Sequence, residues 1–238
     1  MIRTGTAWMV LSFLVMPGAD NPSLGTSQSA YPIISEFMAH NTQTVADGDG
    51  DYSDWIEIYN PTGENLNINS WYLTDDLTRL DKWRFPSSDV IGLTLPPGGY
   101  LIVFASGKES AGSPYIDSAS FVHANFKLSA EGEDLALVTP DGQTVAHAYE
   151  KFPQQRMDIS YGTPESLEGT GYFTSPTPGQ KNTSLYGGVV KDTKFNVDRG
   201  FYREPFELEI TTSTENATIR YTLDGSEPTV DSGLIYET

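Results

Sequence analysis

The sequence WIEIYNP, residues 55–61, carries the pattern that decides the fold. Successive side chains of a β-strand point to opposite faces, so the two isoleucines share one face, and the aromatic residues share the other with the glutamate. Asn60-Pro61 then forms a strong turn signal. Residues 55–59 are therefore predicted to form a strand with an aliphatic face.

Similar strand signals recur on both sides of this segment. Pro96-Pro97-Gly98-Gly99 introduces YLIVFA, an apolar run without alternation that is typical of a strand buried on both faces. Pro140-Asp141-Gly142 is a turn between two further runs and predicts a hairpin. The further predicted strands are residues 33–38, 71–74, 100–105, 134–139 and 143–148. Because no long stretch has a helical apolar period, the predicted fold class is all-β, with a sandwich architecture.

Composition and charge exclude some classes of function. The 238 residues are 38% hydrophobic and 12% aromatic, which is enough for a packed core. A formal net charge of −18 repels phosphate backbones and anionic lipids, so no nucleic-acid partner is expected. An acidic surface suits cations such as calcium; acidity that only keeps the protein soluble is the alternative. The absence of cysteine excludes disulfides, thiolate zinc sites and cysteine nucleophiles.

The first residues have the pattern of an export signal. Arg3 supplies a positive n-region, and residues 6–16 (TAWMVLSFLVM) are apolar but too short to span a bilayer. Residues 1–19 are predicted to be a signal peptide cleaved after Ala19. Cleavage after Ala30 and a buried N-terminal strand are the alternatives. The protein is expected to be secreted or on the cell surface of a bacterium, with no membrane span after cleavage.

Changes in composition divide the rest of the chain. Residues 20–30 form a spacer, and residues 161–186 are rich in Gly, Pro, Ser and Thr, which indicates a domain end and linker. The predicted division is residues 31–182 for the first domain, 183–200 for the linker and 201–238 for a second β module. Because two or three strands leave an open sheet edge, this second module is expected to be incomplete.

Six short motifs follow one another in the first domain. They are ISEF (34–37), DYSDWIEIYNP (51–61), NSWYLTD (69–75), LPPGGY (95–100), FKLS (126–129) and TPGQKN (177–182). Their order and spacing resemble a lamin-tail domain of the bacterial exported, planctomycete type. The resemblance implies an immunoglobulin-like β-sandwich without intrinsic catalysis. Two insertions, at residues 75–86 and 106–123, exceed what a minimal sandwich needs.

The second module contains one telling run, ATIRYTLDGSEPT at residues 217–229. It resembles the C-terminal β-sandwich module of chitobiase-type hexosaminidases, which is an accessory domain in that family. In large exported bacterial proteins of the planctomycete type, this pair of modules often precedes a spore-coat-type kinase-like domain. The resemblance therefore implies further domains of the same polypeptide.

Acidic residues gather just before the strand at residues 55–59. Asp47, Asp49, Asp51 and Asp54 lie on a glycine-containing loop, where carboxylates at alternate positions can converge on one hard cation. The loop is not an EF-hand, because Tyr52 stands at the sixth position, where Gly is required. These four aspartates are the predicted calcium ligands, and calcium is the one candidate cofactor. A solvated acidic loop is the alternative.

Enzyme signatures are absent from the sequence. None of the three histidines belongs to an H-E-x-x-H pattern, and there is no G-x-S-x-G elbow, P-loop or dinucleotide fingerprint, so no enzymatic activity is predicted. Trp55, Trp71 and Trp83, with Tyr59 and Tyr72, are predicted to pack in the core, with a platform for sugar rings as the alternative.

The predicted function is a non-catalytic binding or scaffolding module that acts in adhesion, spacing or presentation. Its partner is expected to be a protein or a glycan at the cell surface. The alternative is an accessory targeting portion of a carbohydrate-active enzyme whose catalytic domain lies beyond the chain end. A lamin-like DNA-binding role rests on fold analogy alone, and the charge and the export signal both oppose it.

Overall fold

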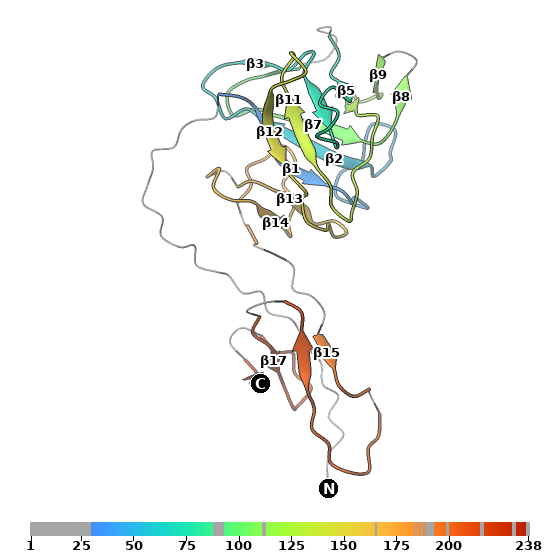
Figure 1. Ribbon diagram of the computed structural model, residues 1–238, viewed down its shortest axis with the longest axis vertical. Coiled ribbons are helices and arrows are strands. Elements are labelled where there is room, and N and C mark those ends of the chain that lie inside the picture. Colours follow the sequence, from blue (N-terminus) through green and yellow to red (C-terminus); the bar gives the residue numbers. More distant parts are fainter. Residues whose placement is uncertain are drawn as a thin grey trace. The chain divides into compact units, whose positions relative to one another are not determined.

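The computed structural model describes residues 30–87, 93–110, 113–164, 166–183, 185–186, 188, 193–198, 200–214, 217–229 and 232–236. The chain divides near Gly188 into two compact units. The predicted signal peptide and all but the last residue of the predicted spacer lie outside the described residues. Within the described part, every regular element is a β-strand, which confirms the all-β prediction (Figure 1). The same residues include no helix of the length and hydropathy that crossing a membrane requires.

An eight-stranded sheet forms one layer of the larger unit. In spatial order its strands are β14 (Gly171–Phe173), β13 (Ser160–Gly162), β1 (Ile33–Met38), β2 (Asp54–Tyr59), β7 (Tyr100–Ala105), β10 (Val122–His123), β9 (Ser113–Ile116) and β8 (Glu109–Ser110). The pairing of β7 with β10 is parallel, and the other pairings in this sheet are antiparallel. The sheet ends at β8, inside the second insertion.

A four-stranded sheet forms the second layer (Figure 1). Its strands, in spatial order, are β12 (Val145–Tyr149), β11 (Leu135–Val138), β4 (Tyr72–Thr74) and β5 (Trp83–Arg84). The remaining ladder of this unit pairs β3 (Leu66–Asn67) with β6 (Thr94–Leu95). The predicted hairpin is present as β11 and β12, and the Thr139 N–H closes its turn on the Thr144 carbonyl at 2.9 Å.

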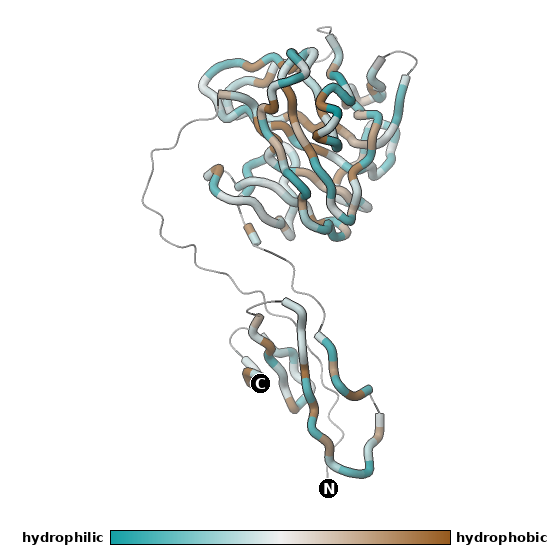
Figure 2. The backbone as a smooth tube through the Cα atoms, viewed as in Figure 1, coloured by the Kyte–Doolittle hydropathy of each residue, from teal (hydrophilic) through white to brown (hydrophobic). Residues whose placement is uncertain are grey.

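The main core lies between the two sheets. Ile56 and Ile58 of β2 are fully buried there, as the alternation predicts, and they belong to one cluster with Leu73 of β4 and Leu137 of β11. Hydrophobic segments accordingly run through the interior strands of this unit (Figure 2). Since the two layers share this core, the larger unit is a β-sandwich, as predicted.

A smaller core covers the opposite face of the eight-stranded sheet. Trp55, Met38 and Phe104 are fully buried in it, and Val45 and Phe121 pack against them. Val45 belongs to the loop before β2, and Phe121 belongs to the second insertion. This core therefore fixes both segments on the outer face of the sheet.

Two strands lie in the Gly- and Pro-rich residues 161–186, which composition had assigned to a domain end and linker. Strands β13 and β14 extend the main sheet beyond β1. A Cβ atom at Gly162 would lie 2.1 Å from the Ser35 carbonyl oxygen, so only glycine permits this approach of β13 to β1. A small residue that resembles a loop signal is here required by sheet packing.

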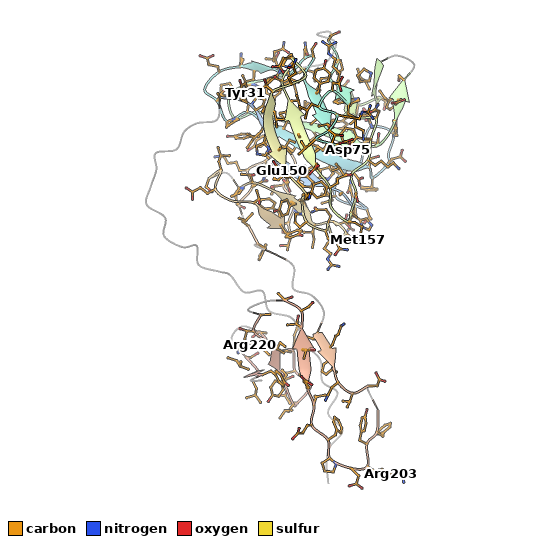
Figure 3. The ribbon with its side chains drawn as sticks, viewed as in Figure 1. Tyr31, Asp75, Glu150, Met157, Arg203 and Arg220 are labelled. Atoms are coloured by element: carbon orange, nitrogen blue, oxygen red, sulfur yellow. The ribbon has the colours of Figure 1, made fainter. Side chains whose placement is uncertain are left out.

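The smaller unit contains two antiparallel ladders, β15 (Thr193–Phe195) with β16 (Ile210–Thr212), and β17 (Arg220–Tyr221) with β18 (Leu234–Ile235). Arg203 and Arg220 are labelled in Figure 3. Among its described residues, Ile210 is the one large hydrophobic side chain that is buried, whereas Phe201 is 95% exposed. Two short ladders with exposed apolar side chains agree with the expected incomplete module.

Candidate functional site

The loop of residues 47–51 is closed by its first aspartate. Oδ1 of Asp47 accepts the backbone N–H of Asp49 at 3.1 Å and that of Asp51 at 2.9 Å. The Asp47 N–H in turn donates to the Asp51 carbonyl at 2.8 Å. Gly50 has a φ of 87°, in the left-handed region that favours glycine. The loop is therefore a tight turn held by its own backbone.

Lys108 lies at the centre of the loop carboxylates. Its Nζ is 3.0 Å from Asp47 Oδ2, 2.7 Å from Asp49 Oδ2 and 2.9 Å from Asp51 Oδ2. Desolvation disfavours the charged ammonium, but the hydrogen bonds to the three carboxylates outweigh it and raise the pKa of Lys108 above its usual value. We call Asp47, Asp49, Asp51 and Lys108 the aspartate–lysine cluster. Tyr115 adds a hydroxyl hydrogen bond to Asp49 Oδ2 at 2.9 Å.

Asp54, the fourth predicted calcium ligand, does not join this cluster. It begins β2, and its Oδ2 accepts the Leu128 N–H at 3.2 Å. Burial raises the pKa of Asp54 to about 6, although the hydrogen bond from Leu128 opposes the shift. In the part of the chain that the structure describes, no three His, Asp or Glu side chains are arranged to hold a metal ion. Calcium binding by this loop therefore stays a prediction.

A buried relay of Ser106, His123 and Asp117 fastens the loop to the second insertion. His123 Nδ1 lies 2.8 Å from Ser106 Oγ, and its Nε2 lies 3.0 Å from Asp117 Oδ2. Asp117 Oδ2 also accepts the Gly48 N–H at 2.6 Å. A Cβ atom at Gly48 would lie 2.5 Å from Asp117 Oδ1, so the close approach requires glycine. Because the three relay side chains are at most 9% exposed, their contacts serve the structure of the loop.

The two insertions meet at a pocket of about 320 Å³. Its lining residues are Lys82, Trp83, Arg84, Lys108, Glu109, Ser110, Pro114 and Asn125. The first three belong to residues 75–86, and the next four belong to residues 106–123. Strands β5 and β8, which carry several of these residues, are edge strands of the two sheets. The insertions that exceed a minimal sandwich thus build one hollow at its edge.

The three cations of the pocket differ in their partners. Lys82 forms an ion pair with Asp75 (labelled in Figure 3), and Lys108 is held by the aspartate–lysine cluster. The Arg84 guanidinium lies 5.6 Å from the centre of the Tyr72 ring, in a cation–π contact. No carboxylate among the described residues pairs with it. Arg84 therefore carries the cationic charge of the pocket that is not compensated.

Polar acceptors lie beside these cations. Asn125 Nδ2 donates to Glu109 Oε1 at 2.6 Å. The Asn125 Oδ1 atom is buried and accepts no hydrogen bond from the described residues. Most buried polar atoms in proteins have a partner, so Oδ1 is an unsatisfied acceptor of a residue that lines the pocket.

Two of the motifs each carry a buried glutamate that stabilises the sandwich. Glu36 and Glu57 are cross-strand neighbours on β1 and β2, and both are fully buried. Glu36 Oε1 accepts hydrogen bonds from the Ser160 hydroxyl and, at 3.1 Å, from the Thr177 N–H. Glu57 Oε2 accepts the Gly179 N–H at 2.5 Å. The two carboxyl groups therefore anchor residues 177–182, which we call the C-terminal strap.

The tryptophans pack as predicted. Trp55, Trp71 and Trp83 are 0%, 7% and 5% exposed, so core packing is confirmed. Of the three, Trp83 also lines the pocket. The alternative of an aromatic platform built by all three does not fit their burial.

Sequence patterns did not identify Lys108, Arg84 or Asn125 as site residues. Lys108 is 57 or more positions from the aspartates that it contacts, and no short motif spans that distance. The available signal was their position, since Arg84 and Lys108 lie inside the insertions and Asn125 is the second residue after the second insertion.

Comparison with known families gives two matches. The model of the Lamin Tail Domain family matches residues 26–151, and that of the chitobiase/beta-hexosaminidase C-terminal domain matches residues 197–238. No curated protein and no solved structure matches the chain. The first match covers more than half of the 238 residues, and the second lies within the smaller unit and begins after β15.

Proposed function

The chain belongs to the lamin tail domain family, and we propose that it acts as a non-catalytic binding and scaffolding module of an exported or cell-surface protein. Its role is adhesion, spacing or presentation. The domain of this family is an immunoglobulin-like β-sandwich, and the matching chitobiase module is likewise non-catalytic. In such modules a rigid sandwich holds the segments that contact the partner.

One observation carries the proposal: the two insertions converge on one pocket. The segments that connect strands tolerate insertions and commonly carry function, whereas the core packing is common to all proteins of the same fold. Here residues 82–84 and 108–110 come from different sheets and line one hollow. The aspartate–lysine cluster and the buried relay hold one wall of it in place. This is the expected construction of a preorganised binding site.

The binding function is tested with the full chain and a panel of purified oligosaccharides and peptides, neutral, acidic and basic. We expect at least one class to bind with an affinity that Arg84→Gln lowers. Arg156→Gln makes the same charge change at an exposed residue outside the pocket lining and should leave the affinity unchanged. Binding that responds equally to both variants would place the binding surface elsewhere and overturn the proposed site.

Export is a second part of the proposal and has its own experiment. The apolar residues 6–16 and the small residue Ala19 support a cleaved signal peptide. When the full chain is expressed in a bacterium, we expect the protein outside the cytoplasm, with a mass that corresponds to a new N-terminus at Asp20. Retention of Met1 on cytoplasmic protein would contradict export.

A carbohydrate-directed accessory role is the second candidate function. The observation that favours it is the chitobiase/beta-hexosaminidase C-terminal match at residues 197–238. Phe201 and Tyr202 of this unit are 95% and 50% exposed, and aromatic faces stack on sugar rings. Co-sedimentation with chitin that Phe201→Ala weakens and Arg84→Gln does not would support this candidate. Absence of co-sedimentation would count against it.

A further inference from the structure

We propose that the pocket between β5 and the β8–β9 hairpin binds a sugar that carries a carboxylate, a uronic acid or its glycoside. The inference rests on the proposed binding function and names the ligand class of that site. Three properties of the pocket lead to it: an uncompensated guanidinium, an unpaired acceptor atom of a lining residue, and the volume.

The guanidinium of Arg84 favours an anionic ligand. Lys82 and Lys108 also line the pocket, but each already has a carboxylate partner in the protein. Arg84 has the Tyr72 ring beneath it and no such partner among the described residues. A guanidinium presents a planar fork of donors that matches a carboxylate in two parallel hydrogen bonds. Contact with the ring restricts the fork before a ligand arrives.

The hydrogen-bond acceptors of the pocket favour a ligand that also donates hydrogen bonds. Asn125 Oδ1 is buried without a donor, and its amide nitrogen is already committed to Glu109. Glu109 and Ser110 add further oxygen atoms to the lining. A simple carboxylate offers acceptors only and would leave these groups unpaired. A ring with several hydroxyl groups and one carboxylate supplies donors and an anion in one molecule.

The size of the pocket agrees with a single sugar unit. A volume of about 320 Å³ lies at the lower end of the range for small-ligand sites. Trp83 and Pro114 contribute apolar surface to the same lining, which suits the C–H faces of a sugar ring. The volume therefore suits one residue of a sugar chain whose neighbouring residues remain in solvent.

The net charge of −18 does not prevent binding of an anion here. At physiological ionic strength the Debye length is about 8 Å, so distant carboxylates are largely screened. Lys82 is paired with Asp75, and Lys108 faces three aspartates, so Arg84 is the cation of the lining that is left to meet an anion, with Glu109 opposing it. Since carboxylates of the protein already compensate the charges of Lys82 and Lys108, affinity should depend mostly on Arg84 and should fall as salt is added.

The test uses the ¹⁵N-labelled full chain and NMR titrations with D-glucuronate, with D-glucose and with an acidic tetrapeptide. We expect glucuronate to shift the amide signals of Trp83, Glu109 and Ser110 along a saturable curve, with a Kd of about 1–10 mM for so small a ligand. Arg84→Gln should weaken binding about tenfold or more, because it removes a charge-assisted hydrogen bond. Asn125→Ala should weaken the binding of both sugars, whereas Arg156→Gln should leave the binding of both unchanged.

Each other outcome has a defined meaning. Glucose that binds as tightly as glucuronate, or full affinity in Arg84→Gln, would overturn the anionic ligand class. Binding of the tetrapeptide without glucuronate would overturn the sugar class and leave the proposed binding function standing. If none of the three probes shifts the pocket signals, the inference falls, and the broader panel then decides the proposed function separately.

Discussion

At the scale of single residues, Glu57 makes the stability of the sandwich depend on pH. Burial raises the pKa of Glu57 to about 8; hydrogen bonds from Ser35 and Gly179 oppose the shift, and the charge of Glu36 adds to it. In the unfolded chain a glutamate has a pKa of about 4.3. Between these values the folded state holds a proton that the unfolded state has released, so the free energy of unfolding falls as pH rises.

The glutamine side chain of Glu57→Gln is neutral at every pH. We therefore expect the free energy of unfolding of this variant to fall by about 1–3 kcal/mol less than that of the wild type between about pH 5 and pH 8. Urea unfolding at the two pH values measures it. Glu36, Asp54 and Glu133, whose pKa values are also raised by burial, contribute to the decline that remains. His147, whose pKa burial lowers to about 4, opposes the decline below about pH 6.5. Glu150→Gln, at an exposed position, is the control and should leave the slope unchanged. A variant Glu57→Gln with the full wild-type slope would show that this carboxyl group is not its source.

Lys108 decides whether the loop of residues 47–51 needs a metal ion. In the wild type its ammonium already contacts the carboxylates of Asp47, Asp49 and Asp51, so calcium must compete with it. Lys108→Met keeps an unbranched side chain and removes the charge. We expect a lower Tm than the wild type without calcium, and a larger rise in Tm with millimolar calcium. At a calcium concentration 100 times Kd, binding would add about 2.7 kcal/mol.

The matched control for this experiment is Lys194→Met, which removes an exposed lysine of the smaller unit. Its calcium response should equal that of the wild type. If calcium raises the Tm of the wild type and of Lys108→Met equally, metal binding does not involve the cluster. If Asp49→Ala also fails to change the response, the loop is a solvated acidic turn.

At the scale of elements, the C-terminal strap closes the sandwich through one buried amide. Asn182 Nδ2 donates to the carbonyls of Ser35 and Thr163, both at 3.0 Å, and its Oδ1 accepts the Thr177 hydroxyl at 2.6 Å. Asn182→Ala leaves these buried groups unpaired and is expected to cost about 1–3 kcal/mol in urea unfolding. Gln180→Ala, exposed on the same strap, should cost much less. Equal losses would mean that the strap contributes little to stability.

The longer strands could be predicted from the sequence because their patterns are long enough to be recognised. Alternation marks β2, an apolar run marks β7, and turn residues mark the β11–β12 hairpin, and all of them lie where these patterns predict. Strands such as β5 and β8 have two residues each, too few to show a period, and they form because neighbouring strands hold them.

The candidate site was predictable only in part for a related reason. Asp47, Asp49 and Asp51 meet because they share one turn, and their convergence follows from local spacing. Asp54 leaves the group because it begins β2 and pairs with Ala105, so the sheet sets its direction. Lys108 and Arg84 enter from distant segments, and contacts of that kind depend on the packing of two sheets.

At the scale of the whole molecule, the two units differ in how they are stabilised. The larger unit has two layers, a shared core and a second core on the outer face of the eight-stranded sheet. The smaller unit has two ladders of two or three residues per strand, with Leu223 77% exposed and Phe201 95% exposed. Isolated two-stranded ladders are marginally stable in water. Resistance to proteolysis should therefore be concentrated in the larger unit.

Limited proteolysis of the full chain with a protease of broad specificity tests this difference. We expect rapid cleavage within the smaller unit and a fragment of the larger unit that ends between residues 183 and 200, identified by mass spectrometry. Cleavage requires local opening, and a segment with few buried apolar side chains opens at low free energy. The fragment should keep the unfolding midpoint of the main transition, because both cores lie before Gly188. Persistent protection of residues 206–236 would show instead that the two short ladders are stable as they stand.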